Sequence, residues 1–257
     1  MIPIFETTAL VVLAAMLALW LVSLRISNAS IVDIFWGIGF VVIAWTAHVV
    51  SGNSSPRAWL IVALATSWGV RLAVHLAIRN VGHGEDFRYR AMREKYGSAF
   101  PFISLGTVFL LQGALMWIIS LPLQAAHAPG EATSLGWLDA LGAITWLTGI
   151  VFEAVADAQL ARFKRSPGAA GAVMDRGLWR YSRHPNYFGD CLVWWGFGAI
   201  GVAAGAWWSL AGPVVMTVLL LQVSGVALLE STIADRRPGY REYAARTSAF
   251  VPWWPRR

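Results

Sequence analysis

The chain opens with an unbroken apolar run, Ala9-Leu-Val-Val-Leu-Ala-Ala-Met-Leu-Ala-Leu-Trp-Leu-Val22. A helix rises about 1.5 Å per residue, so the surrounding segment 7–24 reaches most of the way across a hydrocarbon core of about 30 Å. Further apolar runs follow near residues 31–50, 58–78, 104–124, 135–156, 188–206 and 211–230. The sequence therefore predicts an all-α, polytopic integral membrane bundle of about seven transmembrane helices.

The composition excludes most other protein classes. Hydrophobic residues make up 57% of the 257 residues and charged residues 13%, whereas a soluble domain has about 25% charged residues. The mean hydropathy is +0.57, and the single cysteine, Cys191, has no partner for an intrachain disulfide. A soluble enzyme, a disordered tail and a disulfide scaffold are thus excluded. We expect one membrane domain over residues 1–257.

The basic residues indicate an orientation. All of the 20 Lys and Arg except Arg57 and Arg71 fall in the first, third and fifth connections or in the C-terminal tail. Cytoplasmic loops carry an excess of Lys and Arg, so the N-terminus is expected outside and the C-terminus in the cytoplasm. The net charge of +6 then reflects topology, and no nucleic-acid partner is expected. We expect a bacterial inner membrane, with the active site facing the cytoplasm.

Ionisable and amide groups in the predicted spans gather near their cytoplasmic ends. Such charges cost several kcal/mol in lipid unless they face a partner or a wet cavity, so they suggest function. The pairs Arg71 and His75, and Glu153 and Asp157, are each spaced i, i+4 and share a helix face. The other members of the set are Asp33, Gln112, Asp190 and Glu230. Together they predict a polar pocket; for any one group, the alternative is an interhelical hydrogen bond or snorkelling.

The densest polar signal is Asp175-Arg-Gly-Leu-Trp-Arg-Tyr-Ser-Arg-His-Pro-Asn-Tyr-Phe-Gly-Asp190, which leads into the sixth predicted span. Pro185 suits the first turn of a helix, whose free amides attract anions. With Arg183 and His184 beside it, this helix start is a candidate site for phosphate or pyrophosphate. The aromatic residues Trp179, Tyr181 and Tyr187 offer faces to a planar ring. The alternative is an interfacial aromatic belt with snorkelling arginines.

The tail is polar and aromatic. It contains Arg236-Arg-Pro-Gly-Tyr-Arg-Glu-Tyr243 and then Ser248-Ala-Phe-Val-Pro-Trp-Trp-Pro255. This pattern predicts a short amphipathic helix with an interfacial Pro/Trp anchor, which could fold back as a lid on the pocket. No Cys or His spacing typical of a metal site occurs in the chain, so no bound metal is expected.

These motifs resemble the steroid 5-alpha-reductase-like family of membrane proteins of the DUF1295 type. The resemblance rests on residues 177–189, Leu229-Glu230, Tyr243 and Phe250-Val-Pro252, and upstream on Val32-Asp-Ile-Phe-Trp-Gly37, Trp68-Gly-Val-Arg-Leu72, Glu85-Asp-Phe-Arg-Tyr89, Gln112 and Glu153-Ala-Val-Ala-Asp157. Steroid 5-alpha reductases are seven-helix enzymes that use NADPH to reduce a double bond conjugated to a ketone. The resemblance implies NADPH, bound by region 104–257, and a lipophilic enone, steroid-like or another lipid, that enters from the bilayer.

The resemblance also assigns roles. Asn186 matches an asparagine that contacts the nicotinamide half of NADPH, Asp190 matches the acid that closes its motif, and Asp157 matches a cofactor-contacting aspartate. The complete set expected to bind the cofactor is Glu153, Asp157, Arg162, Lys164, Trp179, Tyr181, Arg183, His184, Asn186, Tyr187, Asp190, Glu230, Arg241 and Tyr243.

The substrate side departs from the reductase pattern. Reductases hold the ketone with a Gln-Glu pair and a Tyr, whereas here the Tyr aligns with His75 and only Asp33 stands near the place of the Glu. The ketone oxygen gathers charge as hydride reaches the β-carbon, so a donor must be aimed at it. We expect His75 to be that catalytic donor, oriented by Asp33 and Arg71. Trp36 and Gln112 are expected to line the substrate pocket.

Two other functions compete with the reductase. Arg183-His-Pro-Asn-Tyr187 and Glu230 also resemble isoprenylcysteine carboxyl methyltransferases and phospholipid methyltransferases, which bind S-adenosylmethionine at this location. NADPH carries several phosphate charges, whereas S-adenosylmethionine carries one carboxylate. The many basic residues of the fifth connection therefore suit NADPH better. A non-catalytic seven-helix transporter or receptor would place polar groups along a route across the bilayer instead of at one end.

Overall fold

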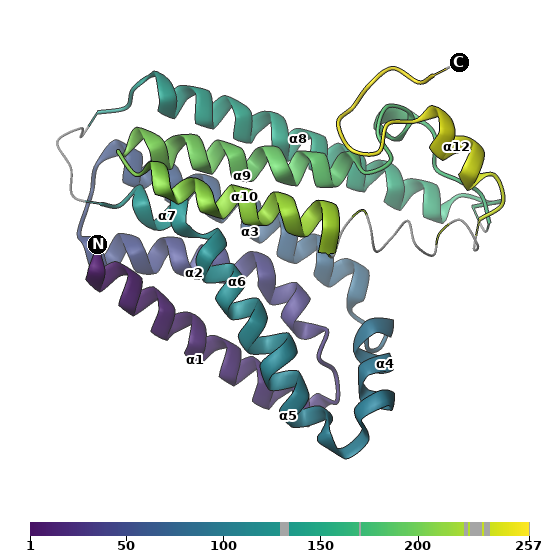
Figure 1. The fold of residues 1–257 in the computed structure, drawn as a ribbon, viewed down its shortest axis with the longest axis horizontal. Helices are drawn as coiled ribbons and strands as arrows, with labels where there is room; N and C mark the ends of the chain where they lie inside the picture. The colour runs from purple at the N-terminus through teal and green to yellow at the C-terminus, as the bar shows by residue number, and fades with distance from the viewer. Residues whose placement is uncertain (129–133, 170, 224–225, 227–232, 234–236, 257) are drawn as a thin grey trace. The chain divides into compact units, whose positions relative to one another are not determined.

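Every regular element in the described part of the chain is a helix, which confirms the all-α prediction (Figure 1). The computed structural model describes residues 1–257 except 129–133, 170, 224–225, 227–232, 234–236 and 257. Five helices are long and apolar enough to cross a membrane: α1 (Ile2–Ile26), α2 (Ile31–Ser51), α3 (Pro56–Asn80), the run Phe87–Ile119 and α8 (Trp137–Arg165).

Two further helical stretches correspond to the last two predicted spans. The helix α9 (Pro185–Ala203) has 19 residues and spans roughly 28 Å, and a shorter apolar stretch covers Trp207–Val223. The run predicted near 211–230 continues into residues that lie outside the described part. The count of seven spans and the orientation of the termini therefore stay predictions.

The run Phe87–Ile119 is built of several pieces: α4 (Phe87–Tyr96), a 3-10 turn (Gly97–Ala99), α5 (Phe100–Ser104), the π-helix η2 (Leu105–Leu110) and α6 (Leu111–Ile119). The remaining elements are α7 (Leu121–Ala125), 3-10 turns at Gly177–Arg180 and Trp207–Leu210, α10 (Ala211–Val218), the π-helix Leu219–Val223 and α12 (Tyr240–Arg246). The sequence predicts one span over 104–124, but the helix breaks at Ser120. Pro122 lacks the N–H that would continue the ladder, so it fits only the first turn of a new helix.

The chain divides into two compact units, which are described separately. Unit 1 comprises Met1–Asp139 and Ile200–Gly212, and unit 2 comprises Ala140–Ala199 and Pro213–Arg257. The expectation of one membrane domain, with the cofactor region in 104–257, stays a prediction.

In unit 1, glycine lets α2 and α3 approach each other closely. A Cβ added at Gly37 would lie 2.3 Å from the carbonyl oxygen of Gly69, and one added at Gly69 would lie 2.5 Å from that of Gly37. Lipid gives helices no hydrophobic drive to associate, so small residues that allow backbone contact matter more than in water. The buried rings of Phe40 and Trp68, with centroids 5.7 Å apart, pack beside this contact.

A buried ion pair fixes the opposite end of α3. The guanidinium of Arg57 donates to both carboxylate oxygens of Asp139 at 2.8 Å, and the backbone N–H of Gly136 donates to the same carboxylate. The sequence predicts that Arg57 lies alone on the outer side of the membrane, and the structure shows the acid that compensates its charge. Because both side chains are buried, loss of either would strand a charge.

In unit 2, α8 and α9 run side by side in antiparallel directions (Figure 1). A Cβ at Gly149 would lie 2.6 Å from the carbonyl oxygen of Gly189, and a Cβ at Gly196 would lie 2.7 Å from that of Gly142. The two contacts are seven residues apart on each helix, which is close to two helical turns. One face of α8 therefore contacts one face of α9 at two levels, and at each level the backbones touch.

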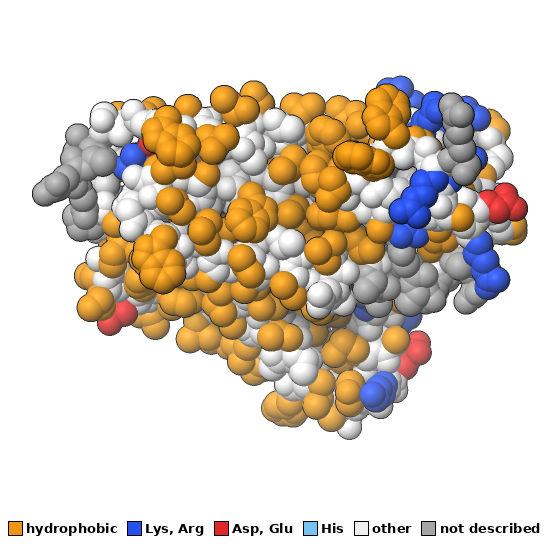
Figure 2. All heavy atoms as spheres, turned by 45° about the horizontal axis from the view of Figure 1, so that its top comes forward, with side chains coloured by type: hydrophobic (Ala, Val, Ile, Leu, Met, Phe, Trp, Pro, Cys, Tyr) orange, Lys and Arg blue, Asp and Glu red, His pale blue; other side chains and the backbone are white. Residues whose placement is uncertain are grey.

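The outer surface of these helices is apolar, as a bilayer requires. Hydrophobic side chains cover much of the visible face in Figure 2. Leu10 on α1 and Ile144 on α8 are 65% and 64% exposed. In water such surfaces would drive aggregation, so they fit an integral membrane protein.

A buried histidine lies in the turn that follows α7. The Nδ1 of His127 is 2.8 Å from the carbonyl oxygen of Leu123, and its ring lies 5.6 Å from that of His48. Burial lowers the pKa of His127 to about 4, despite the hydrogen bond to Leu123, and His48 adds to the shift. The neutral imidazole is therefore the folded form at mildly acidic pH.

The first prediction concerns the glycine contacts. We expect Gly37→Ala and Gly149→Ala each to lower the free energy of unfolding by about 1–3 kcal/mol, because the new methyl group presses on backbone. Thermal unfolding in mild detergent measures the effect. Gly106→Ala is the control, since a Cβ there meets nothing within 4 Å. Wild-type melting of both contact variants would show that the helices do not touch at these positions.

The second prediction concerns pH. Between about pH 6.5 and pH 4 the unfolded chain binds a proton at His127 and the folded chain does not, so stability falls as the pH falls, by up to about 3 kcal/mol. In a series of melting curves from pH 7 to 4.5, His127→Gln should flatten this dependence. His83→Gln, at an exposed position, should leave it unchanged. An equal pH dependence in both variants would contradict the assignment.

Candidate functional site

A polar cluster in unit 1 surrounds Asp33, which lies in the first turn of α2. One carboxylate oxygen of Asp33 accepts a hydrogen bond from the hydroxyl of Tyr89 at 2.7 Å, and the other accepts one from Arg88 at 2.9 Å. The side-chain amide of Gln112 on α6 donates to the Tyr89 oxygen at 3.2 Å. Tyr89 is buried, with 5% of its surface exposed. Residues from α2, α4 and α6 thus form one hydrogen-bonded chain of acid, phenol and amide.

The segment that precedes α4 holds this cluster in place. Glu85 accepts two hydrogen bonds from Arg93 and one from the backbone N–H of Ala29, and the backbone N–H of Asp86 donates to the hydroxyl of Ser30. The partners of the loop in these last two bonds, Ala29 and Ser30, both lie in the turn that leads into α2. The loop is therefore tied to the helix start that carries Asp33.

The acids of this loop stay charged. Burial works against the charge of Glu85, but Arg93 and the Ala29 N–H outweigh it and lower the pKa of Glu85. Burial likewise opposes the charge of Asp86, and hydrogen bonds from Arg88 lower its pKa. The ion pairs that anchor α4 therefore persist at neutral and mildly acidic pH.

The other residues predicted on the substrate side also lie in unit 1. Arg71 and His75 are half-buried and one turn apart on α3. Trp36 packs edge-on against Phe40 along α2, with ring centroids 5.4 Å apart. Of the predicted residues, the structure brings Asp33 and Gln112 together through a tyrosine.

Arg88 and Tyr89 are the members of the cluster for which the sequence predicts no catalytic or binding role. They lie in Glu85-Asp-Phe-Arg-Tyr89, which supports the family resemblance. The sequence did hold a signal for these two residues. An acid in a membrane helix needs a cation and hydrogen-bond donors, and an Arg next to a Tyr supplies both. The sequence did not show which of several basic segments would meet Asp33.

In unit 2, two predicted cofactor ligands meet at the start of α9. The side-chain amide of Asn186 donates to Asp157 on α8 at 3.2 Å. Glu153 lies one turn before Asp157, and both acids are buried, with 4% and 9% of their surfaces exposed. Gly189 allows α9 to approach α8 closely enough for this hydrogen bond. A Cβ added at Gly189 would lie 2.5 Å from the backbone nitrogen of Glu153.

The segment before α9 is fixed by side chains that bond to backbone. The indole N–H of Trp179 donates to the carbonyl oxygen of Ala156 on α8, and the hydroxyl of Tyr243 donates to that of Trp179. Burial, reinforced by Tyr240, raises the pKa of Tyr243, so its hydroxyl stays protonated and keeps donating. Trp179 and Tyr243 thus position the segment.

The tail folds back onto this segment, as the sequence predicted. The backbone N–H of Arg183 donates to the carbonyl oxygen of Ser248, and the Ser182 hydroxyl donates to the carbonyl oxygen of Phe250. The backbone N–H of Trp253 donates to the carbonyl oxygen of Tyr181. The helix α12 and the residues after it therefore cover the outside of residues 181–183. Whether they act as a lid over a pocket stays a prediction.

The remaining predicted ligands divide into buried and exposed groups. His184 is buried and stacks on Tyr187, with ring planes 3° apart, and the Tyr181 ring meets Trp254 edge-on. Asp190 is half-buried in the first turns of α9. The exposed members are Arg162, Lys164 and Arg241. Glu230 lies outside the described residues.

Basic side chains gather around the α12 end of unit 2, where Figure 2 shows several Lys and Arg close together. The exposed residues Arg176, Arg180 and Arg246 add to those named above. The start of α9 therefore has buried carboxylates next to it and exposed cations near it. Among the described residues, no group of three or more His, Cys, Asp or Glu side chains could hold a metal ion.

Comparison with known proteins gives the family. The chain is 26% identical over 270 residues to an uncharacterized protein of Schizosaccharomyces pombe, covering 91% of this chain and 75% of that protein. No solved structure matches the chain. Residues 19–247 match the family described as "Protein of unknown function (DUF1295)". The chain therefore belongs to the DUF1295 family.

Proposed function

We propose that this protein is a membrane-embedded, NADPH-dependent reductase that transfers hydride to the carbon–carbon double bond of a lipophilic enone. The enone enters from the bilayer, and the protein has seven spans with its N-terminus outside and its C-terminus in the cytoplasm. This places the polar ends of the spans, and the site, on the cytoplasmic face of the membrane.

One observation carries the proposal: the Tyr89 hydroxyl is held between Asp33 and Gln112. In the resemblance to steroid 5-alpha reductases, the ketone is held by a glutamine, an acid and a tyrosine. In the sequence, His75 aligns with that tyrosine, so the phenol has no counterpart at the aligned position. In the structure, the same three chemical groups meet from separate positions in the chain.

These groups suit the charge that develops in enone reduction. As hydride adds to the β-carbon, the ketone oxygen becomes negative, and a preorganised donor lowers the barrier. The single hydroxyl hydrogen of Tyr89 points to Asp33 and is free to rotate about the C–O bond. When it turns to a ketone, Arg88 stays on Asp33 and keeps that carboxylate compensated.

This geometry favours Tyr89 over His75 as the donor. Tyr89 is buried and has an acid and an amide fixed on its oxygen, as a preorganised donor requires. His75 lies in the same unit, and our expectation that Asp33 and Arg71 orient it stays open. The two assignments predict different effects of substitution.

The start of α9 fits a phosphate-bearing cofactor. NADPH, when bound, supplies the hydride; the chain supplies the N-terminal end of a 19-residue helix with its partial positive charge, the Arg183 side chain next to it and the exposed cations near it. Within the described part of the chain, the Asn186 side chain has one hydrogen bond, from one amide N–H to Asp157, which leaves its carbonyl and second N–H for a ligand. These groups suit a carboxamide, as on a nicotinamide.

A second candidate, a methyltransferase that uses S-adenosylmethionine, also has an observation in its favour. Glu153 and Asp157 are buried acids next to the start of α9, and buried acids favour a cationic ligand such as a sulfonium. The exposed arginines favour the polyanionic cofactor instead. Binding experiments distinguish the two.

The third prediction concerns the donor. With an enone substrate and NADPH, Tyr89→Phe should lower turnover by about 10²-fold or more, the usual contribution of a positioned donor. Its cofactor affinity should not change. His75→Phe should have a smaller effect, because His75 does not hold the oxygen in this assignment. A larger loss in His75→Phe than in Tyr89→Phe would return the role to His75.

The fourth prediction concerns the cofactor. Titration of the purified protein should show binding of NADPH, and Arg183→Ala should weaken it by roughly 10- to 100-fold, since a charged hydrogen bond to phosphate is worth about 1.5–3 kcal/mol. Arg25→Ala, which removes an exposed arginine at the end of α1, is the matched control and should leave affinity unchanged. Binding of S-adenosylmethionine alone would support the methyltransferase. Binding of neither would support a non-catalytic role.

A further inference from the structure

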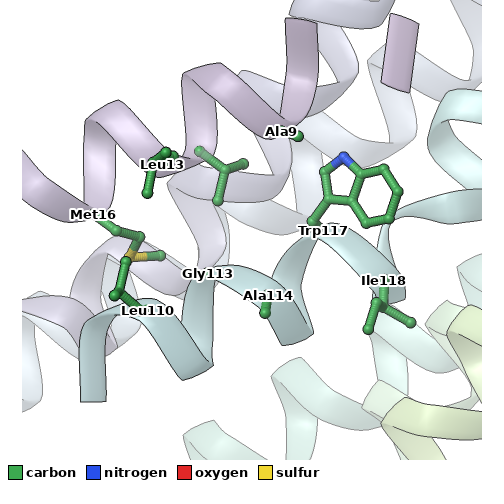
Figure 3. A pocket seen from close by; sticks show the side chains of 9 residues that line it. Ala9, Leu13, Met16, Leu110, Gly113, Ala114, Trp117 and Ile118 are labelled. Carbon is green, nitrogen blue, oxygen red and sulfur yellow. The ribbon is translucent and has the colours of Figure 1, made fainter. Parts of the chain in front are cut away.

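A groove of about 320 Å³ lies in unit 1 between α1 and the run formed by η2 and α6 (Figure 3). Small residues open it: Ala9 on α1 and Ala114 on α6. Larger side chains form its walls. They are Val12, Leu13, Met16, Leu110, Trp117 and Ile118. In Figure 3, Trp117 stands near Ala9 at one end, and Met16 and Leu110 lie at the other.

Gly113 sets the depth of the groove. A Cβ added at Gly113 would lie 2.9 Å from Cγ of Met16, so the helices touch at this point. On the outer side of the contact, Ala9, Leu13 and Ala114 are exposed. The groove is therefore closed at its floor by Gly113 and open on the outside of the helix pair.

The groove lies within the hydrocarbon depth of the bilayer. Its α1 residues extend from Ala9 to Met16, which is about 10 Å along the helix and about 10–20 Å from the first residue of α1. Both flanking helices belong to candidate membrane spans. The open side therefore faces acyl chains, and lipid headgroups lie beyond its ends.

The side chains that line the groove offer no free N–H or O–H group to a ligand. The one side-chain polar atom other than sulfur is the indole nitrogen of Trp117, and its N–H already donates to the hydroxyl of Thr8 at 3.1 Å and to the carbonyl oxygen of Phe5 at 3.3 Å. A ligand that needs hydrogen bonds would lose them here. The chemistry selects a hydrocarbon chain.

We propose that this groove binds one acyl chain of a bilayer phospholipid. A methylene group takes about as much volume as a water molecule, about 30 Å³, so the groove holds roughly ten chain carbons. The length of the groove along the helices suits a chain that lies in it in a bent form. The adjoining π-helix η2 (Leu105–Leu110) widens the helix just before α6, a feature often found at functional sites.

The test uses a phosphatidylcholine with a photoreactive diazirine in the middle of one acyl chain. It is added in increasing amounts to the purified full-length protein in a bile-salt detergent, which has no alkyl chain to compete. After illumination, cross-linked residues are located by mass spectrometry. We expect saturable labelling at Leu13 and Ala114, whereas labelling at Leu21, an exposed residue of α1 outside the groove, rises in proportion to the probe.

Two groove-filling variants and one control complete the experiment. Ala114→Phe should reduce the saturable labelling at least tenfold, because each excluded methylene weakens binding about fourfold. Ala9→Leu tests the opposite wall in case Ala114→Phe does not fold. Ala18→Phe, at an exposed position of α1 outside the groove, should keep wild-type labelling. Equal, unsaturable labelling at Leu13 and Leu21 would overturn the proposal.

A competition arm identifies the part of the lipid that is recognised. An excess of dodecanol, which has a chain and no phosphate, should abolish the saturable labelling. An excess of glycerophosphocholine, which has the headgroup and no chain, should not. The reverse result would mean that a headgroup site elsewhere holds the probe, and the groove would not be an acyl-chain site.

Discussion

Backbone-to-backbone contact through glycine is the constraint on which both units depend. Helices in lipid gain nothing from hiding apolar surface, so their association rests on close packing and on hydrogen bonds. In unit 2, Gly189 sits within the polar signature and at the contact with α8. A side chain there would push α9 away from Glu153, and the hydrogen bond between Asn186 and Asp157 would be lost with it. The same atoms that pack the helices thus align the candidate ligands.

The polar cluster of unit 1 follows a related rule. A carboxylate at the start of a membrane helix needs a cation and hydrogen-bond donors, and Asp33 has an ion pair with Arg88 and a hydrogen bond from Tyr89. The cation comes from α4, which the ion pair of Glu85 and Arg93 ties to the turn before α2. The proposed catalytic group is therefore held by contacts that also hold the fold. This coupling accounts for the placement of a polar motif between two apolar spans.

Much of the site could be predicted from sequence, for identifiable reasons. Ionisable residues are rare in apolar spans, so Asp33, Glu153 and Asp157 stood out, and the helix start at Pro185 followed from the geometry of proline. Tyr89 did not stand out, because its residue type is common near membrane interfaces and only its contacts with Asp33 and Gln112 distinguish it. Trp179 and Tyr243 were expected as ligands, and the structure shows that their polar groups bond to backbone.

By itself the sequence determined the class of protein, the positions of most apolar helices and the residue types that carry charge into them. These features depend on the local cost of exposing polar groups to lipid, which is legible in a single segment of about 20 residues. Only the tertiary structure decided which cation meets Asp33, that Arg57 is paired with Asp139, and that the tail covers residues 181–183. Those outcomes depend on contacts between segments far apart in the chain. Several basic segments could each compensate a given acid equally well, so composition and spacing leave the choice open and packing makes it.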